Sequence, residues 1–357
     1  MGERRSKLAG RWWLLLLPIA VFVVAGQTGG TIAAAQAGEF PAFIPMLGVS
    51  PRGVAVDKVG NVYVSVGAVR SGLEYIQIRK FTPAGELLFS VEVGQGTIGG
   101  LMVKADSDLY IALAAGLDRG VWRMDRDGQI ELLPGSDQIF FANGLAFDDE
   151  GTLYITESVS LTAFVNGKPA GNGSIWCIAR GGEAEVWMRD EVLRGTGALG
   201  QPVWIGANGI AYNHRNLYIT NTEKGTVMRI PVEKDGRAGE PEVWPLQPVP
   251  EFGLPVPYPP MGDGIALDVH GNLYVAVLTK SAVVRINAQD LSQETVAVFR
   301  VPSSLPLFAP LDFPASLFFG TGKGERTNLF VTNLGLGGWV GPGLVKIDAG
   351  VPGRPLH

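Results

Sequence analysis

The chain of 357 residues has little of what several protein classes need. Its single cysteine, Cys177, excludes an internal disulfide framework. The formal net charge of −5 predicts no basic surface for nucleic acid. The apolar stretch at residues 12–25 has about 14 residues, fewer than the about 20 that a membrane-spanning helix usually needs. With three histidines in the whole chain, candidates for a general base of the Ser/His/Asp type are also few.

Glycine and proline, in contrast, are abundant. The chain has 49 glycines and 24 prolines, and 46% of its residues are hydrophobic. This composition is typical of many short strands joined by turns rather than of long helices. A closed all-β fold can reach this length as one domain, so we expect a single domain over residues 38–357.

A short unit recurs six times along the chain. Each copy has a small or polar first residue, a short apolar run, a turn and a second apolar run, and the second run contains tyrosine in five copies. The copies are PRGVAVDKVGNVYVS from Pro51, GGLMVKADSDLYIA from Gly99, NGLAFDDEGTLYIT from Asn143, NGIAYNHRNLYIT from Asn208, DGIALDVHGNLYVA from Asp263 and the degenerate ASLFFGTGKGERTNLFVT from Ala315. A unit of this size that recurs along the whole chain indicates a repeat architecture.

Each copy reads as a β-hairpin, followed by a third strand-like run and in several units by a fourth. Four antiparallel strands form a propeller blade, so the sequence predicts an all-β, six-bladed β-propeller. Too few residues follow the sixth unit to complete its blade. We therefore predict that residues 40–47 supply the outermost strand of the last blade, which would pair the edges of the first and last blades.

Residues 1–37 read as a targeting segment. Ala35-Gln36-Ala37 is a small-residue cleavage site after the apolar stretch, which itself follows four basic residues, Arg4, Arg5, Lys7 and Arg11. Export to the periplasm or the extracellular space is the favoured interpretation, and an uncleaved membrane anchor is the alternative. After cleavage we expect a monomer that contacts neither membrane nor nucleic acid. Cys177 lies in a strand-like run, so we expect a buried thiol.

The hairpin geometry places the first residues of the six copies at one end of the central channel. These are Pro51, Gly99, Asn143, Asn208, Asp263 and Ala315. Glu157 follows the second strand of the third copy and is expected near them. The hairpin turns carry His214 and His270 to the opposite end, so no Ser/His/Asp triad is predicted.

Two features of this end of the channel point to a ligand. Asn143, Asn208 and Asp263 offer hard oxygen donors, the kind that Ca²⁺ prefers. Asn-Gly and Asp-Gly are also ordinary turn dipeptides, which is the simpler interpretation of each one taken alone. Three long segments, residues 193–207, 248–260 and 301–314, lead into blade starts on the same face. Their aromatic residues either line a pocket for substrate or pack onto the propeller; they include Trp204, Tyr258 and Phe308.

At NGLAF, NGIAYN and GDGIALD the chain resembles the senescence-marker-protein (SMP-30)/gluconolactonase/LRE-like family of six-bladed propellers. The resemblance implies a divalent cation in the channel, commonly Ca²⁺, with Zn²⁺ or Mn²⁺ as alternatives. It assigns Asn208 and Asp263 as metal ligands and Asn143 as a contact to metal or substrate. The family's first-blade glutamate is absent: its position falls on Pro51, with Arg52 beside it. Glu157 and Glu39 are the candidates that could replace it.

Two functions follow from these residues. The first is a secreted, metal-dependent hydrolase of lactones or related esters, in which the cation polarises the carbonyl and Asp263 acts as the base or orients it. The second is a non-catalytic propeller that binds a protein partner or a small molecule, because the first blade reads like an NHL repeat. A third alternative, the strictosidine synthase branch of similar propellers, has no dedicated support in the sequence.

Overall fold

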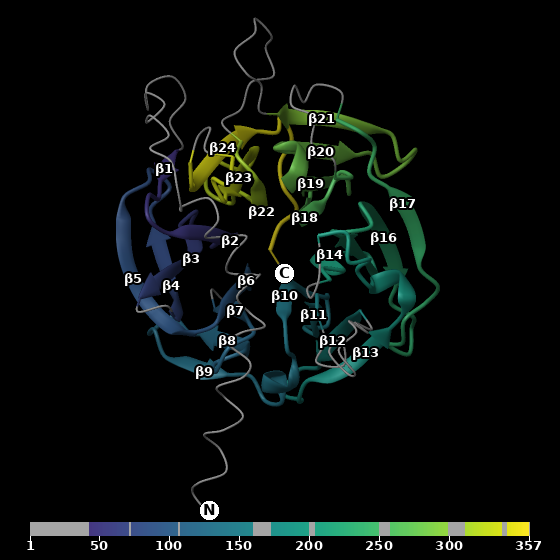
Figure 1. The fold of residues 1–357 in the computed structure, drawn as a ribbon, viewed down its shortest axis with the longest axis horizontal. Coiled ribbons are helices and arrows are strands. Elements are labelled where there is room, and N and C mark those ends of the chain that lie inside the picture. The colour runs from purple at the N-terminus through teal and green to yellow at the C-terminus, as the bar shows by residue number, and fades with distance from the viewer. Residues whose placement is uncertain are drawn as a thin grey trace, which may run out of the picture.

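The computed structural model describes residues 43–70, 73–105, 108–159, 173–199, 204–249, 258–298, 311–337 and 341–356. The targeting segment predicted at residues 1–37 lies outside the described residues. Within the described residues, no helix has the length and the apolar character that crossing a membrane requires. The described chain forms six four-stranded antiparallel sheets arranged around a central channel, so the predicted six-bladed propeller is confirmed (Figure 1).

The first three blades follow one another in chain order, and in each blade the first strand lies innermost (Figure 1). Blade 1 consists of β2 (Ser50–Val56), β3 (Val62–Arg70), β4 (Leu73–Phe81) and β5 (Leu87–Gln95); blade 2 of β6 (Thr97–Val103), β7 (Leu109–Ala114), β8 (Gly120–Met124) and β9 (Ile130–Leu132); and blade 3 of β10 (Ala142–Phe147), β11 (Leu153–Glu157), β12 (Ser174–Ile178) and β13 (Glu185–Arg189).

The last three blades repeat this arrangement, with one exception at the closure. Blade 4 consists of β14 (Ala207–Asn213), β15 (Asn216–Asn221), β16 (Thr226–Pro231) and β17 (Glu242–Pro245); blade 5 of β18 (Gly262–Leu267), β19 (Leu273–Val277), β20 (Ala282–Ile286) and β21 (Gln293–Val298); and blade 6 of β22 (Pro314–Phe319), β23 (Asn328–Asn333), β24 (Gly343–Asp348) and β1 (Ile44–Pro45). The helices among the described residues are three 3₁₀ turns, η1 (Ser136–Gln138), η3 (Glu191–Leu193) and η4 (Leu278–Lys280).

The N-terminal strand closes the ring of blades. Ile44 and Pro45 in β1 pair with Leu344 and Gly343 in β24, so β1 is the outermost strand of blade 6. The edge of β24 is thereby paired, as an exposed strand edge would otherwise be a site for unwanted association. The closure predicted for residues 40–47 is confirmed for the described part of that segment.

Every inner strand carries a β-bulge at the same place. In blade 3, Ala142 pairs with Glu157 and Leu145 with Ile155, so two residues of β10 lie opposite one residue of β11. Such a bulge removes a residue from the ladder and re-aims its side chain. The other five inner strands show the same irregularity, at residues 52–53, 99–100, 208–209, 263–264 and 315–316.

Hydroxyl groups on the second strands replace the lost ladder hydrogen bonds. In blade 4 the Gly209 amide donates to Thr220 Oγ1 (2.9 Å), which in turn donates to the Asp263 carbonyl of blade 5 (2.6 Å). Thr156 makes the equivalent bridge from blade 3 to Asn208. Thr332 does so from blade 6 to the Arg52 carbonyl of blade 1. One threonine therefore satisfies its own blade and fastens the next one to it.

The second residue of the bulge must be small where neighbouring inner strands approach closely. A Cβ atom at Gly144 would lie 2.5 Å from the Asn208 carbonyl oxygen of the next blade, closer than real Cβ contacts allow. Gly209 meets the Asp263 carbonyl in the same way. The Asn-Gly and Asp-Gly pairs of the repeat are thus explained by close contact between blades, with the glycine supplying the room.

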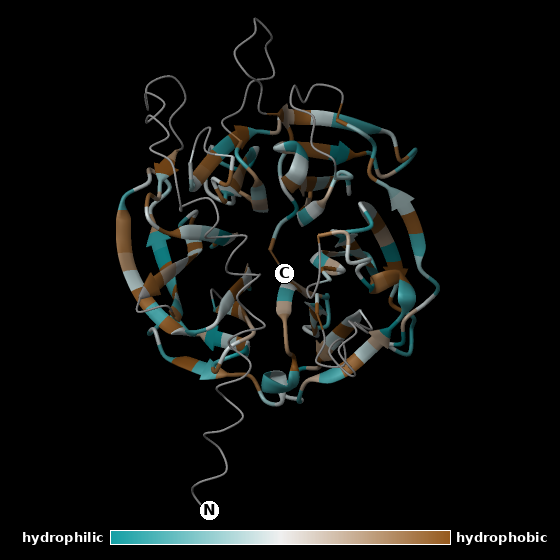
Figure 2. Ribbon diagram, in the orientation of Figure 1, coloured by the Kyte–Doolittle hydropathy of each residue, from teal (hydrophilic) through white to brown (hydrophobic). Residues whose placement is uncertain are grey.

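Apolar packing between blades forms the core. The six largest clusters of buried hydrophobic residues each combine side chains of two neighbouring blades. The repeat tyrosines contribute edge-on aromatic contacts across two of these boundaries, from Tyr110 to Phe147 and from Tyr274 to Phe319. Hydrophobic residues accordingly recur along the strands of all six blades (Figure 2). No blade has a complete core alone, which explains why the fold needs the whole repeat.

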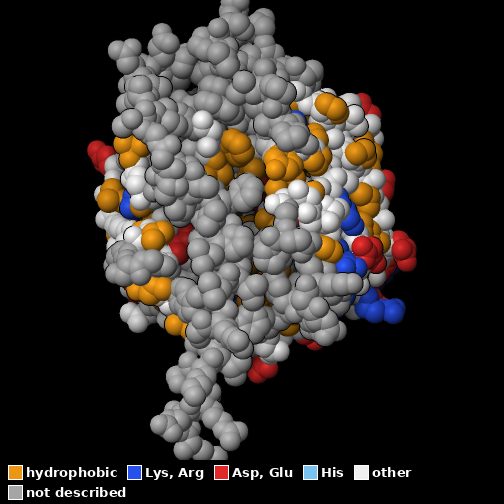
Figure 3. All heavy atoms as spheres, in the orientation of Figure 1, with side chains coloured by type: hydrophobic (Ala, Val, Ile, Leu, Met, Phe, Trp, Pro, Cys, Tyr) orange, Lys and Arg blue, Asp and Glu red, His pale blue; other side chains and the backbone are white. Residues whose placement is uncertain are grey.

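The outer strands carry charges in pairs of opposite sign. Arg229 lies 2.5 Å from Glu242, and Arg285 lies 2.5 Å from Glu294, in each case across the outer two strands of one blade. On the face seen in Figure 3, basic and acidic side chains lie next to one another at the rim. Exposed pairs of this kind contribute only about 0–1 kcal/mol each to stability.

The threonine bridge can be tested with Thr220→Val. The substitution keeps the shape of the side chain but leaves the Gly209 amide and the Asp263 carbonyl without their partner, so we expect the free energy of unfolding to fall by about 2 kcal/mol in urea titrations. Thr226→Val in the same blade is the matched control, because Thr226 Oγ1 is buried with no hydrogen-bond partner among the described residues. Equal effects of the two substitutions would show that the bridge contributes nothing.

Candidate functional site at the channel mouth

The bulges bring six side-chain positions to one mouth of the channel. Aligned by strand register, the first bulge residues are Arg52, Gly99, Asn143, Asn208, Asp263 and Ala315, one per blade. We call these six residues the ring. The prediction that Pro51 belongs to the ring is wrong. Pro51 pairs with Val66 as Ala142 pairs with Glu157, and the residue in the bulge is Arg52.

The two ring asparagines are held in a defined orientation. Asn143 Nδ2 donates to Ser158 Oγ (3.0 Å), and Ser158 Oγ donates to the Ala207 carbonyl (2.7 Å). Because that hydroxyl proton is used, the hydroxyl oxygen must accept from the amide nitrogen of Asn143. The amide oxygen Oδ1 is consequently the end of Asn143 that is left for a ligand.

Asn208 is oriented in the same way one blade further on. Its Nδ2 donates to Thr222 Oγ1 (2.9 Å), which donates to the Gly262 carbonyl (2.9 Å). Sequence analysis missed both positioning hydroxyls, Ser158 and Thr222. Their signal was present in the endings Thr-Glu-Ser and Thr-Asn-Thr of the second strands, in which a hydroxyl residue stands on each side of the residue that the analysis selected.

Asp263 is the only acidic residue of the ring. Burial raises the pKa of its carboxyl to about 7, against the opposing influence of the Arg52 guanidinium and the Asn208 side chain. Its surface is nevertheless partly accessible. A carboxyl group that is surrounded by protein, still reachable by solvent and able to exchange a proton near neutral pH can serve as a general base.

Arg52 lies within electrostatic reach of two acidic residues. Burial raises the pKa of both Asp263 and Glu74 in β4, and the Arg52 guanidinium opposes that rise at both carboxyls without cancelling it. Thr97 Oγ1 donates to Glu74 Oε2 (3.4 Å) at the boundary with blade 2. Arg52 is partly exposed, and its Nε has no hydrogen-bond partner among the described residues. The hydrogen-bonding capacity of the guanidinium is therefore not fully used within the described part of the chain.

The structure does not bring Glu157 to the ring. Its Oε1 accepts from the Phe140 amide (3.0 Å), and its Oε2 accepts from Ser174 Oγ (2.5 Å) and Trp176 Nε1 (2.8 Å). Both oxygens are thus directed into blade 3, where Glu157 is buried. Its role as a metal ligand stays a prediction that this arrangement does not favour.

The predicted aromatic contacts lie on the segments that lead into inner strands. Trp204 and Tyr258 are partly buried and precede β14 and β18, respectively. The backbone near Trp204 is clamped by buried Glu223, whose Oε2 accepts from the amides of Thr196 (2.6 Å) and Gly197 (2.5 Å). Phe308 lies outside the described residues. The roles of Trp204, Tyr258 and Phe308 in substrate binding stay predictions.

The other predicted positions are as expected. His214 and His270 lie in exposed hairpin turns at the opposite end of the inner strands from the ring. Cys177 is buried, and its surroundings, together with nearby Glu185, raise the pKa of the thiol to about 12. A thiol of this kind is unreactive at neutral pH.

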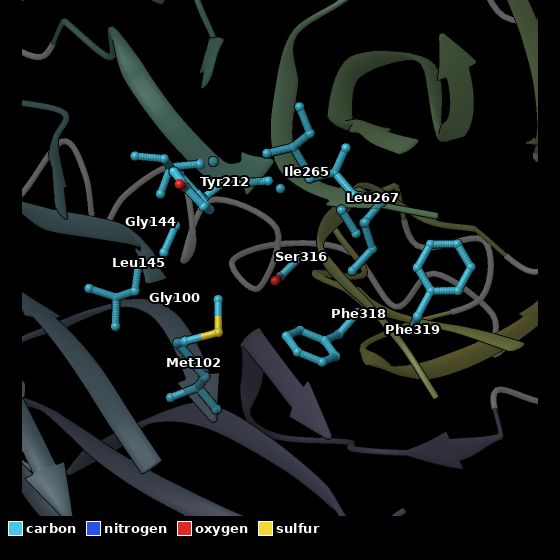
Figure 4. Close-up of a pocket in the computed structure, with 18 of the residues that line it drawn as sticks. Gly100, Met102, Gly144, Leu145, Tyr212, Ile265, Leu267, Ser316, Phe318 and Phe319 are labelled. Carbon is cyan, nitrogen blue, oxygen red and sulfur yellow. The ribbon is translucent and has the colours of Figure 1, made fainter. Parts of the chain in front are cut away.

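Directly beyond the ring the channel becomes apolar. A cavity of about 150 Å³ is lined by the residues that follow the ring on each inner strand, among them Met102, Leu145, Ile265 and Phe318 (Figure 4). The C-terminal tail, residues 352–356, forms its other end (Figure 1). The tail is held where the Arg354 amide donates to the Leu267 carbonyl (2.9 Å) and the Val269 amide donates to the Pro352 carbonyl (3.0 Å). This position of the C-terminal tail was not predicted from the sequence.

The ring does not have the donor set that a divalent cation prefers. It offers two amide oxygens and one carboxyl whose pKa is about 7, and it adds the guanidinium of Arg52 at the same mouth. Ca²⁺ sites depend on several carboxylate or carbonyl oxygens, and a neighbouring positive charge opposes binding. Among the described residues, no cluster of three or more His, Cys, Asp or Glu side chains could hold a metal ion.

Comparison with known proteins agrees with this architecture. Residues 201–332 match the family model described as the SMP-30/Gluconolactonase/LRE-like region. The predicted resemblance is confirmed. The matching segment contains Asn208 and Asp263 and lies outside the blade that carries Arg52. No curated protein matches the chain.

Several solved structures share the fold at low sequence identity. A luciferin-regenerating enzyme has a TM-score of 0.61 and 18% identity, covering 87% of this chain and 95% of that chain. A calcium-binding protein, regucalcin, from Agrobacterium tumefaciens has a TM-score of 0.55 and 18% identity, with coverage of 88% and 96%. A gluconolactonase from Xanthomonas campestris has a TM-score of 0.55 and 16% identity, with coverage of 88% and 88%.

The buried carboxyl of Asp263 predicts a pH-dependent cost in stability. Its pKa is about 7 in the folded state and near the model value of 3.8 in the unfolded state, so the unfolded state releases the proton first as the pH rises. Stability is therefore lost between about pH 4 and pH 7 and stays low above that range. We expect Asp263→Asn to gain several degrees in melting temperature relative to the parent at pH 8, and little at pH 4.5, by scanning calorimetry.

Asp127→Asn, at an exposed hairpin turn, is the control and should show no such pH-dependent gain. A gain of Asp263→Asn that is the same at both pH values would contradict a raised pKa in the folded protein.

Proposed function

We propose that the chain is a hydrolase of lactones or related esters whose active site is the ring. The observation that carries the proposal is that Asp263, a carboxyl poised to exchange protons, shares the channel mouth with two oriented amide oxygens and one guanidinium. The match of residues 201–332 to the gluconolactonase-like family model supports the same reaction class, as does the shared fold with a gluconolactonase.

The residues of the ring can be given separate tasks. A water molecule that donates one hydrogen bond to Asp263 and one to an asparagine Oδ1 would be held and oriented for attack on the substrate carbonyl. Asp263 would accept its proton as the carbon–oxygen bond forms. Ser158 and Thr222 would act as positioning residues, because they fix which end of Asn143 and Asn208 is offered to that water.

The apolar cavity beyond the ring favours substrates with a hydrocarbon portion. Its lining is mainly aliphatic and aromatic, which would exclude a polyhydroxylated sugar chain and accept an alkyl chain. The aromatic side chains Trp204, Tyr258 and Phe308 are proposed to contact the same substrate at the mouth. We accordingly expect δ-lactones with alkyl side chains to be better substrates than sugar lactones.

An additional proposal is that the hydrolase depends on a divalent cation, with Ca²⁺ the preferred ion and Zn²⁺ or Mn²⁺ the alternatives. The calcium-binding regucalcin with the same fold supports it. The single carboxylate and the guanidinium of the ring oppose it. No step of the proposed reaction is therefore assigned to a cation.

Export by the segment at residues 1–37, a monomeric state and a small-molecule partner complete the proposal. The second candidate function, a non-catalytic propeller that binds a small molecule or a protein partner, is favoured by the presence of Arg52 in the first blade, where the resemblance implies a glutamate.

Hydrolysis of a lactone panel tests the proposal. The purified protein, residues 38–357, is assayed by pH-stat on glucono-1,5-lactone, δ-hexalactone and δ-decalactone. We expect kcat/KM to rise along that series. Asp263→Asn should lower kcat by about 10²-fold or more on the best substrate, because it removes the base.

His214→Ala, at an exposed turn at the far end of the inner strands, is the control and should retain parental activity. If the parent turns over none of the three lactones, the hydrolase proposal is rejected and the non-catalytic function is retained. If the parent is active and Asp263→Asn is equally active, Asp263 is not the base.

A further inference from the structure

Arg52 and Asp263 occupy equivalent bulges in blades that are separated by blade 6 alone. Blade 6 contributes Ala315 to the ring, so the position between the two charged residues carries only a methyl group. The backbone of Arg52 is fixed from the same side, since Thr332 of blade 6 donates its hydroxyl proton to the Arg52 carbonyl. The guanidinium thus extends from an anchored base beside the only carboxyl of the ring.

Two acidic residues lie within electrostatic reach of Arg52, and neither forms an ion pair with it in the described part of the chain. The positive charge of the guanidinium opposes the burial-induced rise in the pKa of Asp263 and of Glu74. Among the described residues, no ion pair within 4.0 Å involves Arg52, and its Nε has no hydrogen-bond partner. A buried guanidinium nitrogen without a partner is costly unless a ligand or water supplies one. The two acidic residues favour a guanidinium at this place, and its unpartnered Nε favours an oxygen atom of a ligand or of water beside it.

We propose that Arg52 takes the place of a divalent cation in the ring: its guanidinium binds an oxygen atom of the ligand, either a carboxylate or the carbonyl of an ester, and the site takes no Ca²⁺. The planar fork of donors on arginine matches a carboxylate with two parallel hydrogen bonds. The hydrocarbon part of such a ligand enters the apolar cavity beyond the ring. Binding of a carboxylate does not depend on catalysis, whereas the catalytic part below rests on the proposed hydrolase function.

In that reaction the guanidinium stabilises the charge that develops on the carbonyl oxygen. The oxygen of water bonds to the carbonyl carbon, its proton passes to Asp263, and the carbonyl π pair moves to the oxygen that Arg52 binds. The tetrahedral intermediate then collapses: the carbonyl re-forms, the bond between the carbonyl carbon and the lactone's ester oxygen breaks, and that oxygen takes the proton back from Asp263. The product is a hydroxycarboxylic acid, and its ionised carboxylate is a ligand that Arg52 can hold.

A charge reversal tests the relation between Arg52 and the cation. Melting temperature is measured for the parent, Arg52→Glu and Arg52→Gln with and without millimolar CaCl₂. We expect no change for the parent. Arg52→Glu places a second carboxylate beside Asp263 and should gain a Ca²⁺-dependent rise of several degrees, larger than that of the matched neutral variant Arg52→Gln.

Two results would overturn the cation part of the proposal. One is a Ca²⁺-dependent rise for the parent protein that EDTA reverses. The other is an Arg52→Glu variant that folds and gains no Ca²⁺ response, since position 52 would then not face Asp263. Should Arg52→Glu fail to fold, calorimetric titration of the parent with CaCl₂, MnCl₂ and ZnCl₂ decides, because binding of any of the three contradicts the proposal.

Carboxylate binding is tested with hexanoate, and hexanamide serves as the uncharged ligand of the same shape. Calorimetric titration of the parent should show hexanoate bound at least tenfold more tightly than hexanamide. Arg52→Gln should abolish that preference, and Arg52→Lys should retain part of it, because lysine keeps the charge without the planar fork. An unchanged preference in Arg52→Gln would overturn the assignment.

These measurements separate the inference from the proposed function. If hexanoate binding depends on Arg52 and no lactone is turned over, the binding role of Arg52 stands and the hydrolase proposal fails. If lactones are hydrolysed and hexanoate binding ignores Arg52, the hydrolase stands and the inference fails.

Discussion

The β-bulge at the start of each inner strand is the constraint on which the rest of this structure depends. It sets two residues against one, so the first residue leaves the ladder and its side chain reaches the channel mouth. The second residue must then be small, because the neighbouring inner strand passes within contact distance of its Cα. In blades 3, 4 and 6 a threonine hydroxyl of the second strand accepts from the amide of the second bulge residue and also reaches the next blade.

This device separates the chemistry of the ring from the stability of the fold. The backbone of each ring residue belongs to the bulge, and the strand pairing does not depend on which side chain the residue carries. Residues as different as Arg52, Gly99 and Asp263 therefore occupy equivalent positions without altering the six sheets. The apolar clusters that hold the blades together are built from other residues.

The position of Asp263 in the ring lowers the stability of the folded protein at neutral pH. A carboxyl in the position of Asp263 is disfavoured by burial, and Arg52 and Asn208 offset only part of that penalty. Groups kept in an unfavourable state within an accessible cavity are typical of functional sites. The asymmetry of the channel is also typical of a functional site. A polar mouth leads to an apolar cavity, and the C-terminal tail closes the far end of that cavity.

Much of the fold could be predicted from the chain because its evidence is local. Alternating apolar residues, turns and tyrosines repeat six times, and strand and hairpin formation depend on just such short-range patterns. The count of strands left over at the end predicted the closure by the N-terminal strand, and the turn positions of His214 and His270 followed from the hairpins. The ring positions of Asn143, Asn208 and Asp263 were predicted by the same argument.

Only the tertiary structure decided which side chains meet. The bulge position of Arg52 could have been recognised in the sequence, because Arg52 directly precedes Gly53 as Asn143 precedes Gly144, whereas Pro51 stands one residue too early. Glu157 stands near the ring in sequence, yet its hydrogen bonds to Phe140, Ser174 and Trp176 turn it into the blade. The electrostatic influence of Arg52 on Asp263 acts between residues of blades 1 and 5, which lie far apart in the sequence, and the tail contacts blade 5 across the channel. Local patterns determine strands and turns, whereas the direction and the electrostatic partners of a side chain depend on contacts between blades that no short stretch of sequence contains.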